Sequence, residues 1–408
     1  MPDAPLIVAC DLGTSSLRAV VLEIAPDGRP RVLAGASQPA EGFQDGDFVD
    51  GKAGSVAVAT LLRRLQDEAN VDIRGCTFNV SGSHLRSVMA TGQIPLGQGG
   101  REITARDVDD VMTMARSLRI PFDHRILTVN PVEFAVDRVM GVREPRGRVG
   151  SRLEVKAHLI TGSSSVIRNI ENTIEKAGFE PVGHAVDVLS AATCLLTPGE
   201  RDRGVLLIDV GGEVTQWAAM IDGCLLGMGS VPWGGDHLTH DLASGVRIGR
   251  DEAESSKRDR RVVLRSLVED VDVNILFEEQ DPVETPGLVA AILEPRLEEV
   301  FSLVKDALGP DLPLTRFRGG VVLTGGGSRC RGSRELCDEV FGLQTRVRYL
   351  PEDLEDARRL PTGQWASALG LALWGGGSAT AATTTPEPEP QPGWRGRLER
   401  LFRRRETA

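Results

Sequence analysis

Asp11-Leu12-Gly13-Thr14-Ser15-Ser16 and Asp209-Val210-Gly211-Gly212 are the two stretches that decide the fold, and they lie about half a chain apart. Each follows an apolar run, Leu6-Ile7-Val8-Ala9 or Val205-Leu206-Leu207-Ile208, and precedes a second apolar run. The pattern predicts one strand–turn–strand hairpin used twice, with the two hairpins facing each other across a cleft. Glycine lets a backbone approach a ligand closely, and successive backbone N–H groups in such turns bind anions.

The acidic residue of each turn indicates what the cleft binds. Hard cations prefer oxygen ligands, so Asp11 and Asp209 are predicted to hold Mg²⁺ through its water shell, beside a nucleoside triphosphate. One such turn is weak evidence, because Asp and Gly are common in ordinary β-turns. The prediction is stronger because a third glycine-rich stretch, Gly325-Gly326-Gly327, follows the apolar run Val321-Val322-Leu323-Thr324.

Composition limits the class of protein. The chain has 408 residues, 41% of them hydrophobic, which allows two or more domains with substantial cores. Its net charge of −11 argues against general binding of nucleic acid. The six cysteines show neither a CxxC pair nor disulfide-like spacing, so we expect reduced thiols in the cytosol. Leu6–Cys10 is too short for a signal peptide, and no apolar run is long enough to span a membrane.

Periodicity along the chain predicts alternating helices and strands. Expected helices are Gly54–Ala69, Asp107–Leu118 with Thr104 as N-cap, Ser163–Ala177, Asp187–Leu196 and a last one near Trp365–Trp374. Expected strands besides the two hairpins are Thr77–Ser81, Arg125–Val129, Glu133–Arg138, Arg152–Ile160 and Val321–Thr324. The pattern therefore predicts a small α+β unit over 84–161 and a charged, mostly helical segment over 256–320.

The C-terminal segment has a composition of its own. Residues 376–392 are rich in Gly, Ala, Thr and Pro, which predicts a disordered linker. Residues 393–408 then place four apolar side chains on one helical face among arginines, as in an amphipathic membrane-targeting helix. The predicted membrane contacts are Trp394, Arg397, Leu398, Leu401, Phe402 and Arg403. The chain has 42 Arg and 5 Lys, so a basic arm for nucleic acid is the alternative, but such an arm would not need the apolar stripe.

In these motifs the chain resembles FtsA, a family of actin-like bacterial cell-division proteins. The glycine-rich turns alone are shared with actin, Hsp70 and sugar kinases. Ala253-Glu254-Ser255-Ser256-Lys257 is similar to the family's AExxK helix. The most specific similarities lie elsewhere, in stretches that resemble the family's own inserted subdomain, Val80–His84, Asp123–Leu127 and Lys156–Thr161, and in Gly234–Ala243.

The resemblance implies an α/β, actin-like ATPase fold. Two duplicated core subdomains would face a nucleotide cleft, with an inserted small α+β subdomain and a C-terminal amphipathic helix. The implied boundaries are 1–83 plus 162–190 for core subdomain 1A, 84–161 for the SHS2-like insert 1C, 191–255 plus 324–375 for core subdomain 2A, and 256–323 for subdomain 2B.

The family's activity gives expectations for this chain. It binds ATP, polymerises head to tail and tethers the tubulin-like FtsZ ring to the cytoplasmic face of the membrane at the division site. The resemblance implies that the FtsZ tail docks on 256–323, and that anionic lipids and later divisome proteins are further partners. No nucleic-acid partner is expected.

The same resemblance assigns residues to the site. Asp11 and Asp187 are the expected catalytic residues. Asp187 occupies a position where related proteins place a Glu or Gln that orients the attacking water, although a helix N-cap is an equally good interpretation. The expected nucleotide contacts are Gly13, Thr14, Ser15, Ser16, Asp209, Gly211, Gly212, Glu254, Lys257, Gly325, Gly326 and Gly327, with Glu254 and Lys257 at the ribose and base.

Three residues depart from the family pattern. Glu213 replaces a usual third Gly, Gln216 replaces a usual Asp, and Ser16 stands at a frequent Lys position. A carboxylate about 4 Å from a phosphate costs roughly 1–4 kcal/mol unless Mg²⁺ lies between them. We therefore expect ATP binding with at most weak ATPase activity.

Other interpretations stay open at this point. A small-molecule kinase of the same superfamily needs a catalytic Asp in a substrate cleft and has no use for the C-terminal helix, and a pilus-assembly actin homologue typically lacks that helix. The spacing of Asp236, His237, His240 and Asp241 is compatible with a metal site. Structural zinc sites usually include Cys, however, so polar residues on a helix after Gly234-Gly235 are favoured.

Overall fold

The computed structural model describes residues 5–25, 28–260, 262–268, 285–351, 354–360 and 364–376. The helix expected over 393–408 lies outside the described residues, and so does the linker expected over 376–392 except for Gly376. Residues 269–284 of the expected subdomain 256–323 also lie outside them.

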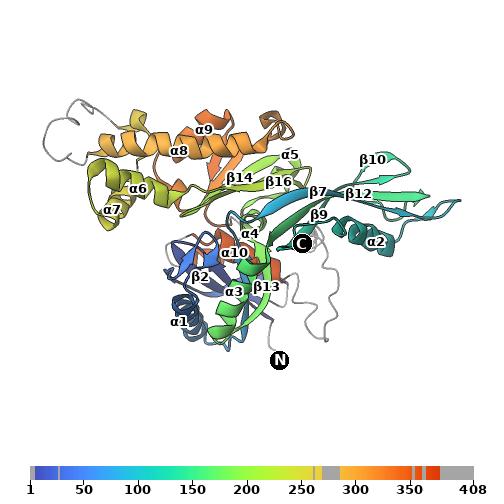
Figure 1. The fold of residues 1–408 in the computed structure, drawn as a ribbon, viewed down its shortest axis with the longest axis horizontal. Coiled ribbons are helices and arrows are strands. Elements are labelled where there is room, and N and C mark those ends of the chain that lie inside the picture. The colour runs from blue at the N-terminus through green and yellow to red at the C-terminus, as the bar shows by residue number, and fades with distance from the viewer. Residues whose placement is uncertain are drawn as a thin grey trace.

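Two five-stranded sheets with the same topology form the body of the molecule (Figure 1). The first has the order β13-β6-β1-β2-β3 and the second β18-β17-β14-β15-β16. In each, a central strand pairs antiparallel with the next strand and parallel with a later one. The first sheet comprises β1 (Leu6–Leu12), β2 (Ser16–Ile24), β3 (Pro30–Pro39), β6 (Gly75–Val80) and β13 (Glu180–Val186). The second comprises β14 (Val205–Val210), β15 (Thr215–Ile221), β16 (Cys224–Val231), β17 (Val321–Thr324) and β18 (Thr345–Val347).

Helices cover both faces of the first sheet because β1 is apolar on both. Cys10 and Leu12 belong to the core formed with α1 (Gly51–Ala69) and α3 (Ser164–Lys176). Ile7 and Ala9 alternate with them and pack against α10 (Ala366–Gly376), which also lies against α4 (Asp187–Leu195). This two-sided burial is typical of a doubly covered sheet.

The second sheet has its own core. Leu206, Ile208 and Val210 of β14 pack with α6 (Gly235–Val246), α8 (Pro286–Leu308) and α9 (Ser333–Phe341). The remaining helices of this half are α5 (Pro198–Arg203) and α7 (Arg250–Arg260). Figure 1 shows these helices on the opposite side of the molecule from α1 and α3.

A separate sheet projects from the body as the expected insert (Figure 1). Its order is β10-β9-β12-β7, with β7 (Arg86–Pro95), β9 (His124–Val136), β10 (Val139–Val142) and β12 (Arg152–Ser163). Helix α2 (Ala105–Arg116) covers it and begins with a capping box between Thr104 and Asp107, as expected for a Thr104 N-cap. Two small pairs complete the described strands: β8 (Arg101–Glu102) with β11 (Val149–Gly150), and β4 (Phe43–Gln44) with β5 (Asp47–Phe48).

One prediction of secondary structure in the insert is wrong. The two strands expected over Arg125–Val129 and Glu133–Arg138 form the single strand β9. The ladder with β12 shifts register at Pro131, which pairs with Ala157 while Glu133 pairs with Lys156. Proline cannot donate to a ladder, and a bulge tolerates it without ending the strand. Helix α1 also begins earlier than expected, because Asp50 caps it by accepting from the N–H groups of Lys52 and Ala53.

Candidate functional site

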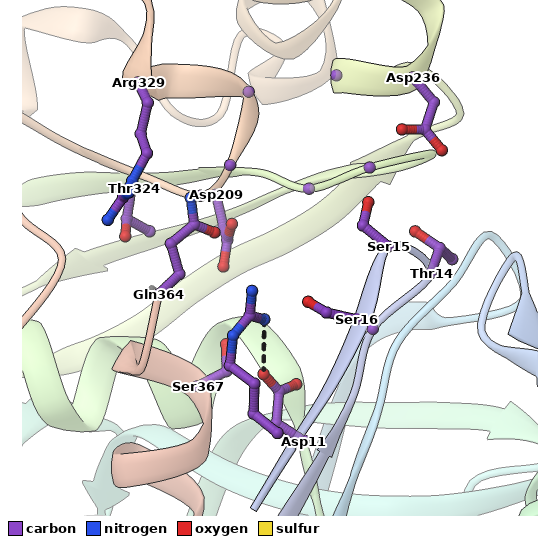
Figure 2. A pocket seen from close by; sticks show the side chains of 18 of the residues that line it. Asp11, Thr14, Ser15, Ser16, Asp209, Asp236, Thr324, Arg329, Gln364 and Ser367 are labelled. Atoms are coloured by element: carbon purple, nitrogen blue, oxygen red, sulfur yellow. Dashed lines mark ion pairs between the residues drawn. The ribbon is translucent and has the colours of Figure 1, made fainter. Parts of the chain in front are cut away.

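A cavity of about 570 Å³ opens between the two sheets at the turns of their hairpins. Every residue predicted to contact nucleotide lines it, from the β1–β2 turn, the β14–β15 turn, α7 and the glycines after β17. Figure 2 shows Asp11 and Ser16 from the first half facing Asp209 and Thr324 from the second. The structure thus brings together residues that the chain places up to about 300 positions apart.

Glycine at the turns allows the two halves to approach each other. A Cβ at Gly212 would lie 2.5 Å from Ser15 Oγ and 2.6 Å from Thr14 Oγ1 of the opposite turn. A Cβ at Gly325, whose φ is +91°, would lie 2.3 Å from the carbonyl oxygen of Val210. Neither position accepts a side chain without movement, which leaves backbone to face the cavity.

Three carboxylates meet at the floor of the cavity. Asn79 of β6 joins two of them, donating from Nδ2 to Asp11 Oδ1 at 2.8 Å and to Asp187 Oδ1 at 3.0 Å. The third, Asp209, belongs to β14 and lies directly opposite Gln216 of β15 in the ladder. Gln216 Nε2 donates to Asp187 Oδ2 at 3.4 Å.

Burial and mutual repulsion make these carboxylates hold their protons more tightly. Burial, with the Asp187 charge nearby, raises the pKa of Asp11 to about 7. Burial also raises the pKa of Asp187. The pKa of Asp209 is raised well above its usual range by burial and by the charges of Asp187 and Asp11. Such a cluster is stabilised when a cation neutralises it.

Asp187 does not cap a helix. It is the first residue of α4, and the N-cap position is Val186, which has no capping side chain. The side chain of Asp187 instead contacts Asn79 and Gln216 within the cavity wall. The N-cap interpretation of Asp187 is therefore wrong.

The cavity also contains polar residues that the sequence did not reveal. Arg18 lines it, with NH1 3.7 Å from Asp11 Oδ2, the ion pair dashed in Figure 2. It follows Ser16 by two positions on β2, so strand alternation could have identified it. Asn79 is 2% exposed, and its only signal in the sequence is a polar residue in an apolar strand. Arg329 and Gln364 line the cavity as well, and no pattern in the sequence pointed to them.

The two residues expected at the ribose and base line the cavity, but they also hold two helices together. Lys257 Nζ donates to the carbonyl oxygen of Gly235 at 2.8 Å and to Thr239 Oγ1 at 2.7 Å, both on α6. It pairs with Glu254 at 2.6 Å. Lys257 is 8% exposed, so these contacts tie α7 firmly to α6.

Glu213, which stands where the family usually has a third Gly, does not have the expected effect of repelling a phosphate. Glu213 does not line the cavity. Its Oε2 accepts from the backbone N–H of Asp45, in the β4–β5 turn of the first half, at 2.7 Å. The carboxylate is therefore used to join the two halves, and the expected repulsion of phosphate does not follow from its position.

Metal ligation can be judged within the described part of the chain. No group of three or more His, Cys, Asp or Glu side chains there is close enough to hold a metal ion directly. Asp236 and Asp241, two of the four residues with metal-like spacing, lie on helix α6, as in the interpretation that was favoured over a zinc site. Their carboxylates form ion pairs with Arg250 and Arg296.

The predicted membrane contacts, Trp394 to Arg403, lie outside the described residues. Among the helices of the described ranges, none has the length and apolarity needed to cross a membrane.

Comparison with known proteins identifies two family models on the chain. The model of the SHS2 domain inserted in FtsA matches residues 82–161, and the model of cell division protein FtsA matches residues 206–370. The cell division protein FtsA of Pseudomonas aeruginosa is 30% identical over 375 residues, which are 91% of this chain and 89% of the relative.

Solved structures agree on the fold. The chain is similar to a PilM–PilN type IV pilus biogenesis complex, with a TM-score of 0.63, 18% identity and coverage of 90% of this chain and 98% of the other. It is also similar to MreB5 of Spiroplasma citri bound to ADP, with a TM-score of 0.55, 15% identity and coverage of 93% and 100%. The fold is therefore the actin-like ATPase fold with an SHS2 insertion, and the chain belongs to the FtsA family of cell-division proteins.

Proposed function

We propose that this cell-division protein binds ATP with Mg²⁺ in the cavity between its two halves. The observation that carries the proposal is the close approach of two glycine turns across one cavity, next to a cluster of one buried carboxylate, Asp11, and two half-buried ones. The structures of Spiroplasma citri MreB5 with ADP and with AMPPNP support it, since they share the fold.

In this proposal, backbone N–H groups of both turns and of Gly325–Gly327 bind the phosphates. Arg18 adds a positive charge beside them, and Glu254 and Lys257 face the ribose and base. Asp11 and Asp209 hold Mg²⁺ through its waters, and the cation neutralises the phosphates and the carboxylate cluster together. Asp187 faces the attacking water.

A binding assay tests this part. The full chain is titrated with a fluorescent ATP analogue, with Mg²⁺ and with EDTA. We expect saturable binding that EDTA weakens at least tenfold, and Asp209→Asn should weaken the Mg²⁺-dependent part. Absence of binding by the unmodified chain would overturn the proposal.

We propose further that the protein polymerises and tethers the FtsZ ring to the cytoplasmic face of the membrane, together with later divisome proteins. The C-terminal segment supports the tether. Each basic residue near an anionic bilayer contributes about 1 kcal/mol, so the net +4 of Trp394–Glu406 gives roughly 4 kcal/mol before the cost of ordering. One copy binds marginally, whereas a filament with many copies binds well.

Vesicle co-sedimentation tests the tether. The full chain, a chain ending at Gly375 and the variant Trp394→Glu are sedimented with anionic vesicles, with and without ATP. We expect ATP to increase pelleting of the full chain and both altered chains to stay in solution. If the chain ending at Gly375 still pellets with vesicles, the C-terminal segment is not the anchor.

The proposed binding region for the FtsZ tail is 256–323, of which α8 is the main described element. Pull-down with an FtsZ C-terminal peptide, beside a scrambled peptide, tests it. Retention of the FtsZ peptide alone supports a division scaffold, whereas equal retention of both peptides contradicts it.

The pilus-assembly and kinase alternatives rest on fold likeness only. ATP turnover that depends on a candidate acceptor alcohol would be the sign of a kinase.

A further inference from the structure

The turn that joins β9 to β10 in the insert has an arginine where the backbone favours glycine. Val136 pairs with Val139, so Asp137 and Arg138 form a two-residue hairpin loop. Their φ angles are +49° and +73°. Two-residue loops with positive φ at both positions prefer glycine at the second one. Because arginine is unfavourable there, we infer that its side chain is retained for a purpose other than folding.

The conformation of this turn is held by its aspartate. Asp137 Oδ1 accepts from the N–H of Ser151 at 2.9 Å, from Ser151 Oγ at 2.7 Å and from the N–H of Arg152 at 2.9 Å. These bonds hold the turn against the start of β12 without using the side chain of Arg138. That side chain is exposed and has no ion pair in the described part of the chain.

Two apolar side chains follow the turn and point to solvent. Val139 is 62% exposed and Met140 is 69% exposed. Between the positions that pair with β9, β10 contains one residue more than its partner, so Met140 belongs to a β-bulge. A Cβ at the next residue, Gly141, would meet no atom within 4 Å. The space beside Met140 is therefore open.

A second segment brings another apolar side chain and another arginine to the same turn. Val149 of β11 is 71% exposed. A Cβ at Gly150, the next residue, would touch Val136 and lie 3.4 Å from Asp137 Oδ2. Arg148 is exposed, again without an ion pair among the residues that the structure describes. We call this surface the insert tip, and it comprises Arg138, Val139, Met140, Arg148 and Val149.

Charge around the insert tip is positive. The segment 137–152 contains five arginines and two acidic residues, a net charge of +3. Asp137 is engaged in the turn, and Glu144 pairs with Arg146 at 2.6 Å. Glu102, which lies opposite Val149 in the β8–β11 pair, is an exposed acidic neighbour. The insert 84–161 has 12 basic and 9 acidic residues, so it is net positive in a chain whose net charge is −11.

We propose that the insert tip is a second membrane contact, which binds anionic phospholipid next to the C-terminal segment. Arg138 and Arg148 bind lipid phosphates, and the three apolar side chains enter the boundary between headgroups and acyl chains. Figure 1 shows β10 in the part of the molecule that projects from the body. A fluid bilayer accepts a projecting apolar turn without a preformed pocket, which a protein partner would have to provide.

This inference rests on the proposed tether, because five side chains are too few to hold the protein at a membrane alone. Its consequence is orientation. A chain attached only through its C-terminal segment can rotate above the bilayer, whereas a chain attached at two points presents one face to it.

Vesicle binding by the full chain tests the contact. Met140→Glu and Arg148→Gln are compared with Val56→Glu and Arg63→Gln, matched changes of exposed residues on α1. We expect each tip variant to weaken binding to vesicles of phosphatidylglycerol and phosphatidylcholine about fivefold, the effect of one basic residue near an anionic bilayer. Both α1 variants should bind as the unmodified chain does.

Arg138→Gly separates membrane contact from folding. Glycine relieves the positive φ of this position, so the variant should unfold at a higher temperature than the unmodified chain. It should nevertheless bind the same vesicles about fivefold more weakly. Damage to the fold cannot produce this combination, and equal vesicle affinity of Arg138→Gly and the unmodified chain would overturn the proposal.

A dye that reports polarity gives a direct readout. It is attached to the thiol of Met140→Cys or, as a control, of Val56→Cys, since the native cysteines are buried or half-buried. Anionic vesicles should shift the emission of the dye at position 140 to shorter wavelength. Vesicles of pure phosphatidylcholine should not, and the dye at position 56 should not respond to either.

The outcomes distinguish this inference from the tether. If the full chain pellets with anionic vesicles, the chain ending at Gly375 does not, and the dye at position 140 shows no shift, the insert tip is not a membrane contact and the tether stands. If no chain pellets with vesicles, both proposals fail. If the tip variants reduce ATP-dependent sedimentation without vesicles, the insert tip joins copies of the chain, which also overturns the inference.

Discussion

Individual atoms at the β1–β2 and β14–β15 turns set how closely the two halves meet. Gly212 faces Thr14 and Ser15 at distances that leave no room for a methyl group unless the two hydroxyl groups move. Asp11, Asp187 and Asp209 share one buried region, so charge on any of them is unfavourable without a cation. At this scale the site is defined by steric space and by charge.

Gly212→Ala should weaken ATP binding at least tenfold, or by about 1.4 kcal/mol, because the added Cβ pushes away the hydroxyl groups of Ser15 and Thr14. A titration with a fluorescent nucleotide measures it. Gly99→Ala is the control, since its Cβ would meet no atom within 4 Å. Unchanged affinity of Gly212→Ala would show that the turns do not bind phosphate in this geometry.

Asp11→Asn should stabilise the nucleotide-free chain at pH 8 and abolish Mg²⁺-dependent binding. Since the folded pKa of Asp11 is about 7 against 3.8 for the free residue, its ionisation costs stability. That cost is absent below pH 4, grows between pH 4 and 7, and stays constant above pH 7. Its full size is on the order of a few kcal/mol.

Denaturant unfolding of both chains at pH 4, 6 and 8, without nucleotide, measures this difference. The gain in stability from Asp11→Asn should increase with pH. A gain that is the same at all three pH values, or a loss at pH 8, would contradict the repulsion in the carboxylate cluster.

At the scale of elements, turns from different halves hold the cleft. The β14–β15 turn contacts the β4–β5 turn through Glu213 and the N–H of Asp45. Asp45 in turn accepts from Ser83, from N–H at 3.1 Å and from Oγ at 2.6 Å, where the chain enters the insert. The three segments form a connected path from the β14–β15 turn to the insert.

Glu213→Ala should remove the hydrogen bond between the β14–β15 turn and the β4–β5 turn and so make the β4–β5 turn more mobile. A hydrogen bond of this kind contributes about 1 kcal/mol, so the Asp45 amide should exchange hydrogen several-fold faster, with little change in overall stability. Hydrogen–deuterium exchange of peptides covering 43–48 measures it. Glu213→Gln keeps an acceptor and should behave as the unmodified chain. Slow exchange in Glu213→Ala would show that the contact has no role in holding the turn.

At the scale of the whole molecule, the insert connects both halves. The chain joins it to the first half, whereas its side chains and backbone contact the second. Cys224 Sγ of β16 donates to the carbonyl oxygen of Val132 at 3.2 Å, and Arg143 pairs with Asp222 at 2.7 Å. Figure 1 shows β7 and β9 running close to β16 before they leave the body. Closure of the cleft should therefore change the direction of the insert.

The Arg143–Asp222 pair tests this docking. Both side chains are more than half exposed, so the pair should contribute about 0.2–1 kcal/mol at low salt and almost nothing at high salt. The measurement is the free energy of unfolding of three variants: Arg143→Asp, Asp222→Arg and the chain that carries both substitutions. The double exchange should recover stability lost in each single variant, and no recovery at low salt would contradict the contact.

The resemblance to FtsA supplied most of the residues that were expected around the cleft. The sequence by itself determined the two hairpins, most helix positions and the small α+β unit. It did so because strand alternation, helical spacing and glycine turns act over a few neighbouring residues. Tertiary structure alone decided that Asn79 joins two carboxylates, that Glu213 points to Asp45 and that Gln216 faces a small cavity. These outcomes depend on strands brought together from distant parts of the chain, and no local pattern specifies which atoms meet there.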